Sequence, residues 1–190
     1  MHHEIANPRT GQTMIFRQTA EDTDGRLLQI ECYHEPHGPR EPLHTHPVQE
    51  SRFEILSGSL TFQIDGIERT AGSGEAVTVP PKVAHCFWND GAVAAHYLQE
   101  FRPALRSEHF FRTLFRLAQE GKLNDRGMPS TLALAVLIPA MGTTIRPISP
   151  PWPVLRALAW LLGPIARMRG YRLIDRDVQP APARHEHTPR

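Results

Sequence analysis

The sequence has few cysteines, little net charge and no long run of apolar residues, and each shortage counts against a class of protein. Its two cysteines, Cys32 and Cys86, are too few for the disulfide framework of a small secreted domain. Both lie in apolar, strand-like stretches, so we expect buried free thiols in a reducing, cytoplasmic compartment. A formal net charge of +1 argues against a nucleic-acid-binding protein, which would carry a basic patch.

The apolar runs that do occur are short. The clearest one, at residues 132–141, is interrupted by Pro139 and cannot span a bilayer. Residues 1–11 lack a basic flank followed by an apolar run, so we expect no signal peptide. With 190 residues, the chain can bury a hydrophobic core and form one domain, or one domain plus an appendage.

Short strand-like runs fill the first 105 residues. Gly, Pro and Asp turns separate them, including an Asp65-Gly66 pair that is typical of a hairpin. The runs lie at residues 13–17, 26–33, 53–56, 60–64, 67–70, 76–79, 85–88 and 95–101. This pattern predicts an antiparallel sandwich or barrel.

Three histidines suggest a metal site. His44 and His46 are two residues apart, so on a strand their imidazoles share one face. His85 follows a β-branched run and two prolines. Because imidazole is the commonest protein ligand of first-row transition metals, these side chains can form three corners of such a site.

The histidines fall within two motifs of fixed spacing. In the first, Gly38 is followed by five residues, then by His44, one residue, His46, three residues and Glu50. In the second, five residues separate Gly74 from Pro80, two residues separate Lys82 from His85, and three more lead to Asn89.

Together these motifs resemble those of the cupins over roughly the first 105 residues. In the second motif only Lys82 departs, because the family has glycine there. The resemblance implies a mainly β fold, a double-stranded β-helix or jelly-roll barrel, here followed by C-terminal α-helices. It also implies a divalent transition metal on His44, His46, His85 and a glutamate, and it leaves open whether the metal is Fe, Zn, Ni, Mn or Cu.

The position of that glutamate is ambiguous. Glu50 lies one residue further from Gly58 than the family spacing requires, and Ser51 occupies the expected place. Phe53 and Ile55 share the parity of Ser51, and a one-residue slip turns a side chain to the other face. Either the strand bulges or starts late and Glu50 binds the metal, or three histidines bind it with Ser51 beside an open position.

Pocket walls and proton-transfer groups follow from the same alternation. We expect the inward side chains to line a pocket around the metal: Ser51, Phe53, Ile55, Phe87 and Leu98. On the last strand, His96, Leu98 and Glu100 share one face. If that face points inward, Glu100 and His96 are candidates for acid–base catalysis or substrate contact; otherwise they face solvent.

Beyond residue 105 the composition becomes helical. We expect a helix at residues 108–120, capped by Ser107 and stopped by Gly121, and a second at residues 154–169, kinked at its internal proline.

We expect the whole extension, residues 106–174, to pack on the barrel or on a second subunit and so form a homodimer. The alternative is contact with a membrane surface, which the arginines around the last apolar run would favour. We expect residues 175–190 to be disordered.

The resemblance implies a small-molecule substrate or ligand. The first hypothesis is a metal-dependent enzyme that acts on a small organic substrate, either aromatic or carbonyl-containing. Within this class we expect a dioxygenase-like reaction rather than isomerisation or cyclisation. The alternative is a non-catalytic binding or sensor protein, because the fold alone does not determine the chemistry.

Overall fold

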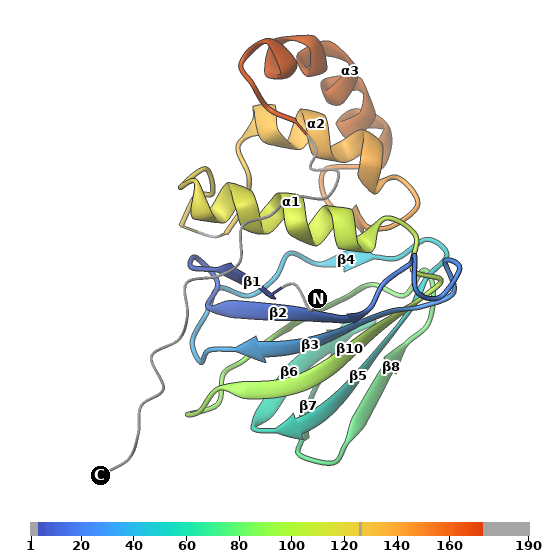
Figure 1. Ribbon diagram of the computed structural model, residues 1–190, viewed down its shortest axis with the longest axis vertical. Coiled ribbons are helices and arrows are strands. Elements are labelled where there is room, and N and C mark those ends of the chain that lie inside the picture. Colours follow the sequence, from blue (N-terminus) through green and yellow to red (C-terminus); the bar gives the residue numbers. More distant parts are fainter. Residues whose placement is uncertain (1–3, 126, 173–190) are drawn as a thin grey trace.

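The computed structural model describes residues 4–125 and 127–172, and its strands form two antiparallel sheets (Figure 1). The six-stranded sheet has the order β1-β2-β3-β10-β5-β8, and the five-stranded sheet has the order β11-β4-β9-β6-β7. The first sheet contains β1 (Glu4–Asn7), β2 (Gln12–Gln18), β3 (Leu28–His34), β10 (Ala95–Arg102), β5 (Glu50–Ser57) and β8 (Ala76–Val79). The second contains β11 (Arg146–Pro147), β4 (His44–Thr45), β9 (His85–Trp88), β6 (Ser59–Ile64) and β7 (Ile67–Gly72). The predicted mainly β jelly roll followed by helices is confirmed.

Alternation along the strands builds the core between the sheets. Along β3, and over the first part of β5 and of β10, every second side chain is buried, as the period of two requires. Aromatic rings dominate the centre: Phe53 contacts both Phe62 and Phe87, and Phe87 contacts Tyr97. Cys32 and Cys86 are buried and free, as the sequence predicts.

Two motif positions show why the turns need particular residues. A side chain at Gly58 would place its Cβ 2.7 Å from the carbonyl oxygen of Ala94, so only glycine fits. Lys82 has a φ of 71°, in the left-handed region, where the family has glycine. A side chain in that conformation costs roughly 1–2 kcal/mol, and the backbone N–H of Lys82 donates to the His46 carbonyl at 2.8 Å.

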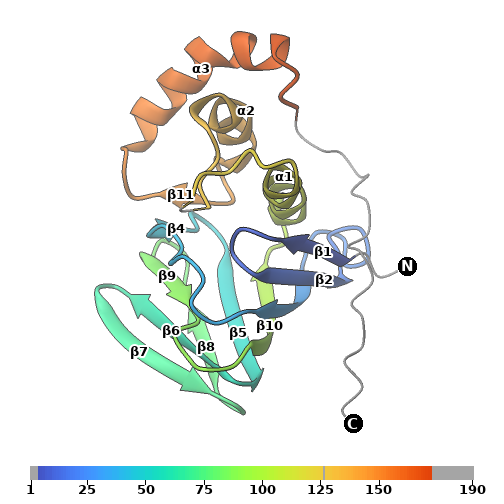
Figure 2. The same cartoon turned by 90° about the vertical axis from the view of Figure 1, so that its left-hand side faces the viewer.

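Three helices follow the barrel as stacked layers (Figure 2). They are α1 (Ser107–Gln119), α2 (Thr131–Met141) and α3 (Trp152–Met168). Helix α1 packs beside β1, α2 packs on α1, and α3 packs on α2 as the outermost layer. No helix in the described part of the chain is long and apolar enough to cross a membrane.

The details at the helix ends differ from the sequence expectation in one respect. Arg106, and not Ser107, is the N-cap residue of α1, and it makes no side-chain cap. Ser107 is instead the first helical residue, and its buried hydroxyl accepts a hydrogen bond from Gln49. Gly121 ends the helix with a positive φ, as expected. The predicted disordered tail, residues 175–190, lies outside the described residues.

The extension also contributes a strand to the barrel. After α2 the chain returns to the five-stranded sheet, where β11 pairs with β4 and places Pro147 opposite His44. The backbone N–H of Ile148 then donates to the Leu43 carbonyl at 3.1 Å. The strand with the first histidine is therefore held between β9 and a segment of the extension.

Candidate metal centre and its cavity

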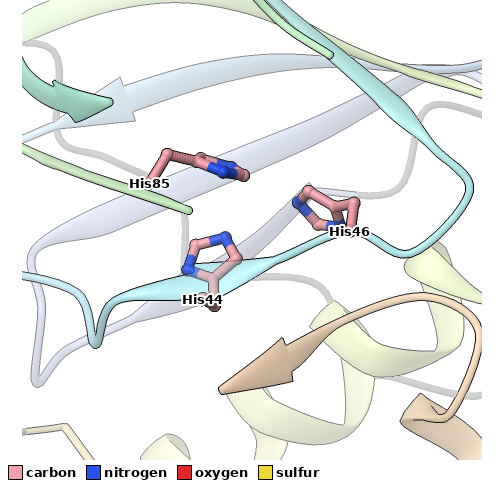
Figure 3. A group of neighbouring side chains, drawn as sticks. All are labelled: His44, His46 and His85. Atoms are coloured by element: carbon pink, nitrogen blue, oxygen red, sulfur yellow. The ribbon is translucent and has the colours of Figure 1, made fainter. Parts of the chain in front are cut away.

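The three predicted histidines converge. His44 lies on β4 directly opposite His85 on β9, and His46 follows at the end of β4. All three are buried, and one ring nitrogen from each lies within 4.8 Å of those of the other two. Figure 3 shows the rings turned toward a shared space. The group is therefore one that a single metal ion could occupy.

Backbone carbonyls determine the tautomer of each ring. The Nδ1 atoms lie 2.9 Å from the Pro42 oxygen for His44, 2.5 Å from the Thr144 oxygen for His46, and 3.0 Å from the Val83 oxygen for His85. A carbonyl can only accept, so each Nδ1 carries the proton. Each Nε2 therefore keeps a free lone pair, which is the arrangement found for histidines that ligate metals.

Burial keeps these rings uncharged at neutral pH. It lowers the pKa of His44 well below the ordinary value, and the neighbouring His85 and His46 lower it further. Burial also lowers the pKa of His46 to about 4, against the opposing effect of the Thr144 carbonyl, and lowers the pKa of His85. A neutral imidazole does not repel a cation and need not lose a proton before it binds one. The three rings are therefore suitable ligands for a transition metal.

A buried amide oxygen adjoins the group. The Nε2 of Gln49 donates to the carbonyls of Pro103 and Ala104, at 2.7 and 3.0 Å, and to the Ser107 hydroxyl at 2.8 Å. These partners fix the amide orientation, because carbonyls accept only. The Oε1 of Gln49 is buried without a hydrogen-bond partner. The Gln49 side chain lies close enough to His46 to raise the pKa of that imidazole, which opposes the effect of burial. A buried acceptor left unpaired is costly, and a bound cation would satisfy it.

The structure excludes Glu50 from this group. Glu50 is half-buried on the outer side of β5, where it pairs in register with Arg102. Ser51 faces inward and is fully buried, opposite Phe101 and Val79. Ser51 and Phe53 lie on the same face of β5, and that face points into the core. Glu50 therefore points outward, and the prediction that it binds the metal is wrong.

A cavity of about 200 Å³ adjoins the histidines, between the barrel and the helices. The barrel supplies His44, His46, His85, Phe87, Gln99 and Phe101 to its wall. Helices α1 and α2 supply mostly apolar side chains, among them Phe110, Phe111, Leu114, Leu134, Leu137 and Ile138. Leu155 of α3 completes the roof. Helical residues thus form much of the cavity wall.

Comparison with known proteins agrees with this architecture. Residues 31–99 match the family described as the cupin domain, and these residues include the three histidines. This part of the chain is therefore similar to a cupin domain. Among curated proteins, none matches this chain.

Several solved structures are similar to part of this chain. One is described as a predicted oxalate decarboxylase from Thermotoga maritima, with 19% identity, a TM-score of 0.48, and coverage of 54% of this chain and 92% of that chain. The polyketide cyclase RemF from Streptomyces resistomycificus has 22% identity, a TM-score of 0.45, and coverage of 53% and 73%. A sugar phosphate isomerase from Silicibacter pomeroyi has 18% identity, a TM-score of 0.43, and coverage of 48% and 59%.

Within the barrel, the face of β10 corrects another prediction. Tyr97, Gln99 and Phe101 are the buried, inward residues. His96 points outward, where it hydrogen-bonds Glu31 at 2.7 Å and stacks on Tyr33.

The other predicted residues of β10 share that outer face. Glu100 accepts hydrogen bonds from Gln29 and Arg102, each at 2.9 Å, and Leu98 is half-buried on the same side. Glu100 and His96 are therefore not catalytic candidates, and Leu98 is not a pocket residue. Of the remaining predicted pocket residues, Phe87 lines the cavity, while Ser51, Phe53 and Ile55 lie buried in the barrel beyond its wall.

The cavity wall carries an acid that the sequence pattern does not predict. Glu41 lies in the loop before β4, and among the described residues it is the one carboxylate on the cavity wall. Its Oε1 is 3.5 Å from the Nε2 of Gln12, whose own oxygen accepts from Thr10. Burial raises the pKa of Glu41 to about 7, and the bond from Gln12 opposes the rise. Glu41 lies close in sequence to His44 and His46, and this proximity was a signal that it could belong to the site. Because it lies in a loop, however, no strand alternation indicates which way its side chain points.

Proposed function

We propose that this protein is a metal-dependent enzyme that acts on a small, largely apolar organic substrate bearing a carbonyl or enol oxygen. The observation that carries the proposal is the convergence of three neutral imidazoles, each with a free Nε2, at the wall of a mostly apolar cavity. Catalytic metal sites keep a coordination position open beside a substrate pocket, whereas structural sites are closed by protein ligands.

The residues fit a divalent transition metal, whether Fe, Zn, Ni, Mn or Cu. His44, His46 and His85 would hold it, and the unpaired Oε1 of Gln49 is the candidate for a fourth donor. A metal bound there supplies a Lewis acid that polarises the substrate oxygen. The aromatic walls of the cavity bind the apolar part of the substrate and keep water away from it.

Glu41 is the proton-transfer group in this proposal. A carboxyl whose pKa lies near 7 can both take and return a proton at neutral pH. Such an acid on a mostly apolar cavity wall favours isomerisation or cyclisation by proton transfer at the carbon next to a carbonyl. The dioxygenase reaction expected from the sequence stays a prediction, and so does the alternative of a non-catalytic binding protein.

Metal analysis tests the site. We expect protein purified without added metal to contain close to one equivalent of a transition metal, and His44→Ala/His85→Ala to lose it. The matched control is His96→Ala, which removes an outward-facing imidazole and should keep the metal. Full metal content in the double variant would contradict the assignment. Partial loss in Gln49→Leu, with the fold intact, would support the fourth donor.

Turnover of β-diketones, catechols and flavonols tests the reaction. Glu41→Gln should lower turnover by roughly 10²- to 10⁴-fold at unchanged metal content, as expected for loss of a general acid–base. Turnover with stoichiometric oxygen uptake, insensitive to Glu41→Gln, would establish the dioxygenase instead. Ligands that raise the melting temperature but are never converted, with any of the five metals, would establish the binding protein.

A further inference from the structure

Helix α3 presents an apolar stripe to solvent. Its buried side, formed by Leu155, Ala159 and Ala166, packs on α2. The exposed stripe recurs every three or four residues and so follows one side of the helix: Val154, Leu158, Leu161, Ile165 and Met168. Met168 is 87% exposed and Leu161 is 61% exposed, and Trp160, on the side of the helix that lines the groove to α2, is 83% exposed. A monomer surface rarely carries an apolar strip of this length without a partner.

Arginines lie on another side of α3, away from the stripe. Arg146, Arg156 and Arg167 line a groove of about 710 Å³ between α2 and α3, together with Trp152 and Trp160. The Arg146 guanidinium is held in place by the Gly142 carbonyl, at 2.8 Å, and lies 5.1 Å from the Trp152 ring centroid. In the described part of the chain, none of the three arginines forms an ion pair with an acid.

The sequence around the groove contains no negative charge. Residues 126–172 include six arginines and no aspartate or glutamate. A second copy docked symmetrically on α3 would bring the same arginines together, and like charges in a desolvated interface are costly. A surface of phosphate groups above an apolar layer matches both features, because it offers anions to the groove and hydrocarbon to the stripe.

The geometry points to a docking site for an anionic phospholipid bilayer, formed by the exposed face of α3 and the α2–α3 groove. Helix α3 lies in the plane of the interface, with its apolar stripe at the boundary between headgroups and acyl chains. Trp160 sits at headgroup depth, as interfacial tryptophans do. Arg146, Arg156 and Arg167 bind lipid phosphates. Helix α3 is the outermost layer of the molecule, so nothing in the described structure blocks this approach (Figure 2).

Vesicle flotation of the full-length protein tests this site. We expect it to float with vesicles that contain phosphatidylglycerol and not with pure phosphatidylcholine, and to dissociate as salt is raised. Trp160→Ser/Leu161→Ser should lower the bound fraction at least tenfold. The matched control is Ile67→Ser/Val93→Ser, which removes exposed apolar residues from the barrel and should bind as the wild type does.

The charge contribution has its own pair of variants. Arg156→Gln/Arg167→Gln should weaken binding about fivefold for each arginine, whereas Arg26→Gln on the barrel should not. All substituted residues are exposed, and melting temperatures equal to wild type verify the fold.

Three results would overturn the proposal. The first is a wild-type protein that does not float, or a Trp160→Ser/Leu161→Ser variant that floats undiminished. The second is a dimer in light scattering that the same variant abolishes, without flotation of the wild type, because a second copy is then the occupant. The third is an arginine-dependent rise in melting temperature with glycerol phosphate, again without flotation, because the groove then binds a soluble phosphate ester.

Discussion

At the scale of single residues, burial moves the titration of the cavity side chains in opposite directions. It raises the pKa of Glu41 to about 7 and lowers the pKa of His46 to about 4, because the cavity disfavours either charge. Both groups are then largely uncharged between these values. The low polarity of the cavity thus keeps the imidazoles neutral, as metal binding requires. It also brings the pKa of the carboxyl close to neutral pH, as proton transfer requires.

The raised pKa of Glu41 makes a prediction for stability. From the ordinary glutamate value of about 4.5 up to about 7, the unfolded chain loses this proton while the folded protein keeps it. The folded state binds more protons in that window, so Glu41 costs stability progressively as pH rises through it. Glu41→Gln should therefore gain free energy of unfolding relative to wild type from pH 5 to pH 8, by at most about 1.4 kcal/mol per pH unit.

Urea unfolding at several pH values measures this difference directly. Glu35→Gln, an exposed carboxylate in the same loop, is the control and should follow the wild type. A Glu41→Gln curve parallel to wild type across the window would show that the carboxyl is not desolvated in the folded protein.

At the scale of elements, β11 and the segment before it couple the extension to the histidine group. The Thr144 carbonyl orients His46, and β11 pairs with the strand that carries His44. Partners that orient a ligating histidine typically matter 10- to 100-fold for metal affinity. The helical extension is therefore part of the site's support, in addition to forming its roof.

A backbone substitution tests this coupling. Ile148→Pro removes the N–H that donates to the Leu43 carbonyl, so the end of β11 should separate from β4. Co²⁺ titration followed by its visible absorption should show metal affinity at least several-fold weaker than wild type. Ile148→Ala keeps the N–H and removes a half-exposed side chain, so its affinity should equal wild type. Equal affinity in both variants would mean that β11 does not support the centre.

The same elements show how far the sequence could lead. The strands and the three histidines were predictable, because period-two alternation and motif spacing are local signals. The face of β10 was not, because alternation gives two faces and only packing makes Tyr97 and Phe101 the inward pair. Gln49 and Glu41 were missed because each lies outside a regular strand, where orientation depends on tertiary contacts. The two-residue strand β11 carries no pattern at all.

At the scale of the whole molecule, the cavity joins the barrel and the helices into one unit. Phe115 of α1 belongs to the barrel core, and Leu137 of α2 helps to form the cavity roof. Neither part can bury these side chains without the other. The sequence placed a domain boundary near residue 105, which stays a prediction, but the packing leads us to expect no independent folding on either side of it.

Site-specific fluorescence can decide between one unfolding unit and two. Trp88 reports on the barrel, and Trp152 and Trp160 on α3. In metal-free protein, we expect Trp88→Phe and Trp152→Phe/Trp160→Phe to have coincident urea transitions by fluorescence and by far-ultraviolet circular dichroism, since shared burial makes unfolding cooperative. An α3 transition at clearly lower urea would show that the outer layer opens first. The cavity would then lose Leu155 from its roof before the histidine group is disturbed, and substrate could enter by movement of α3.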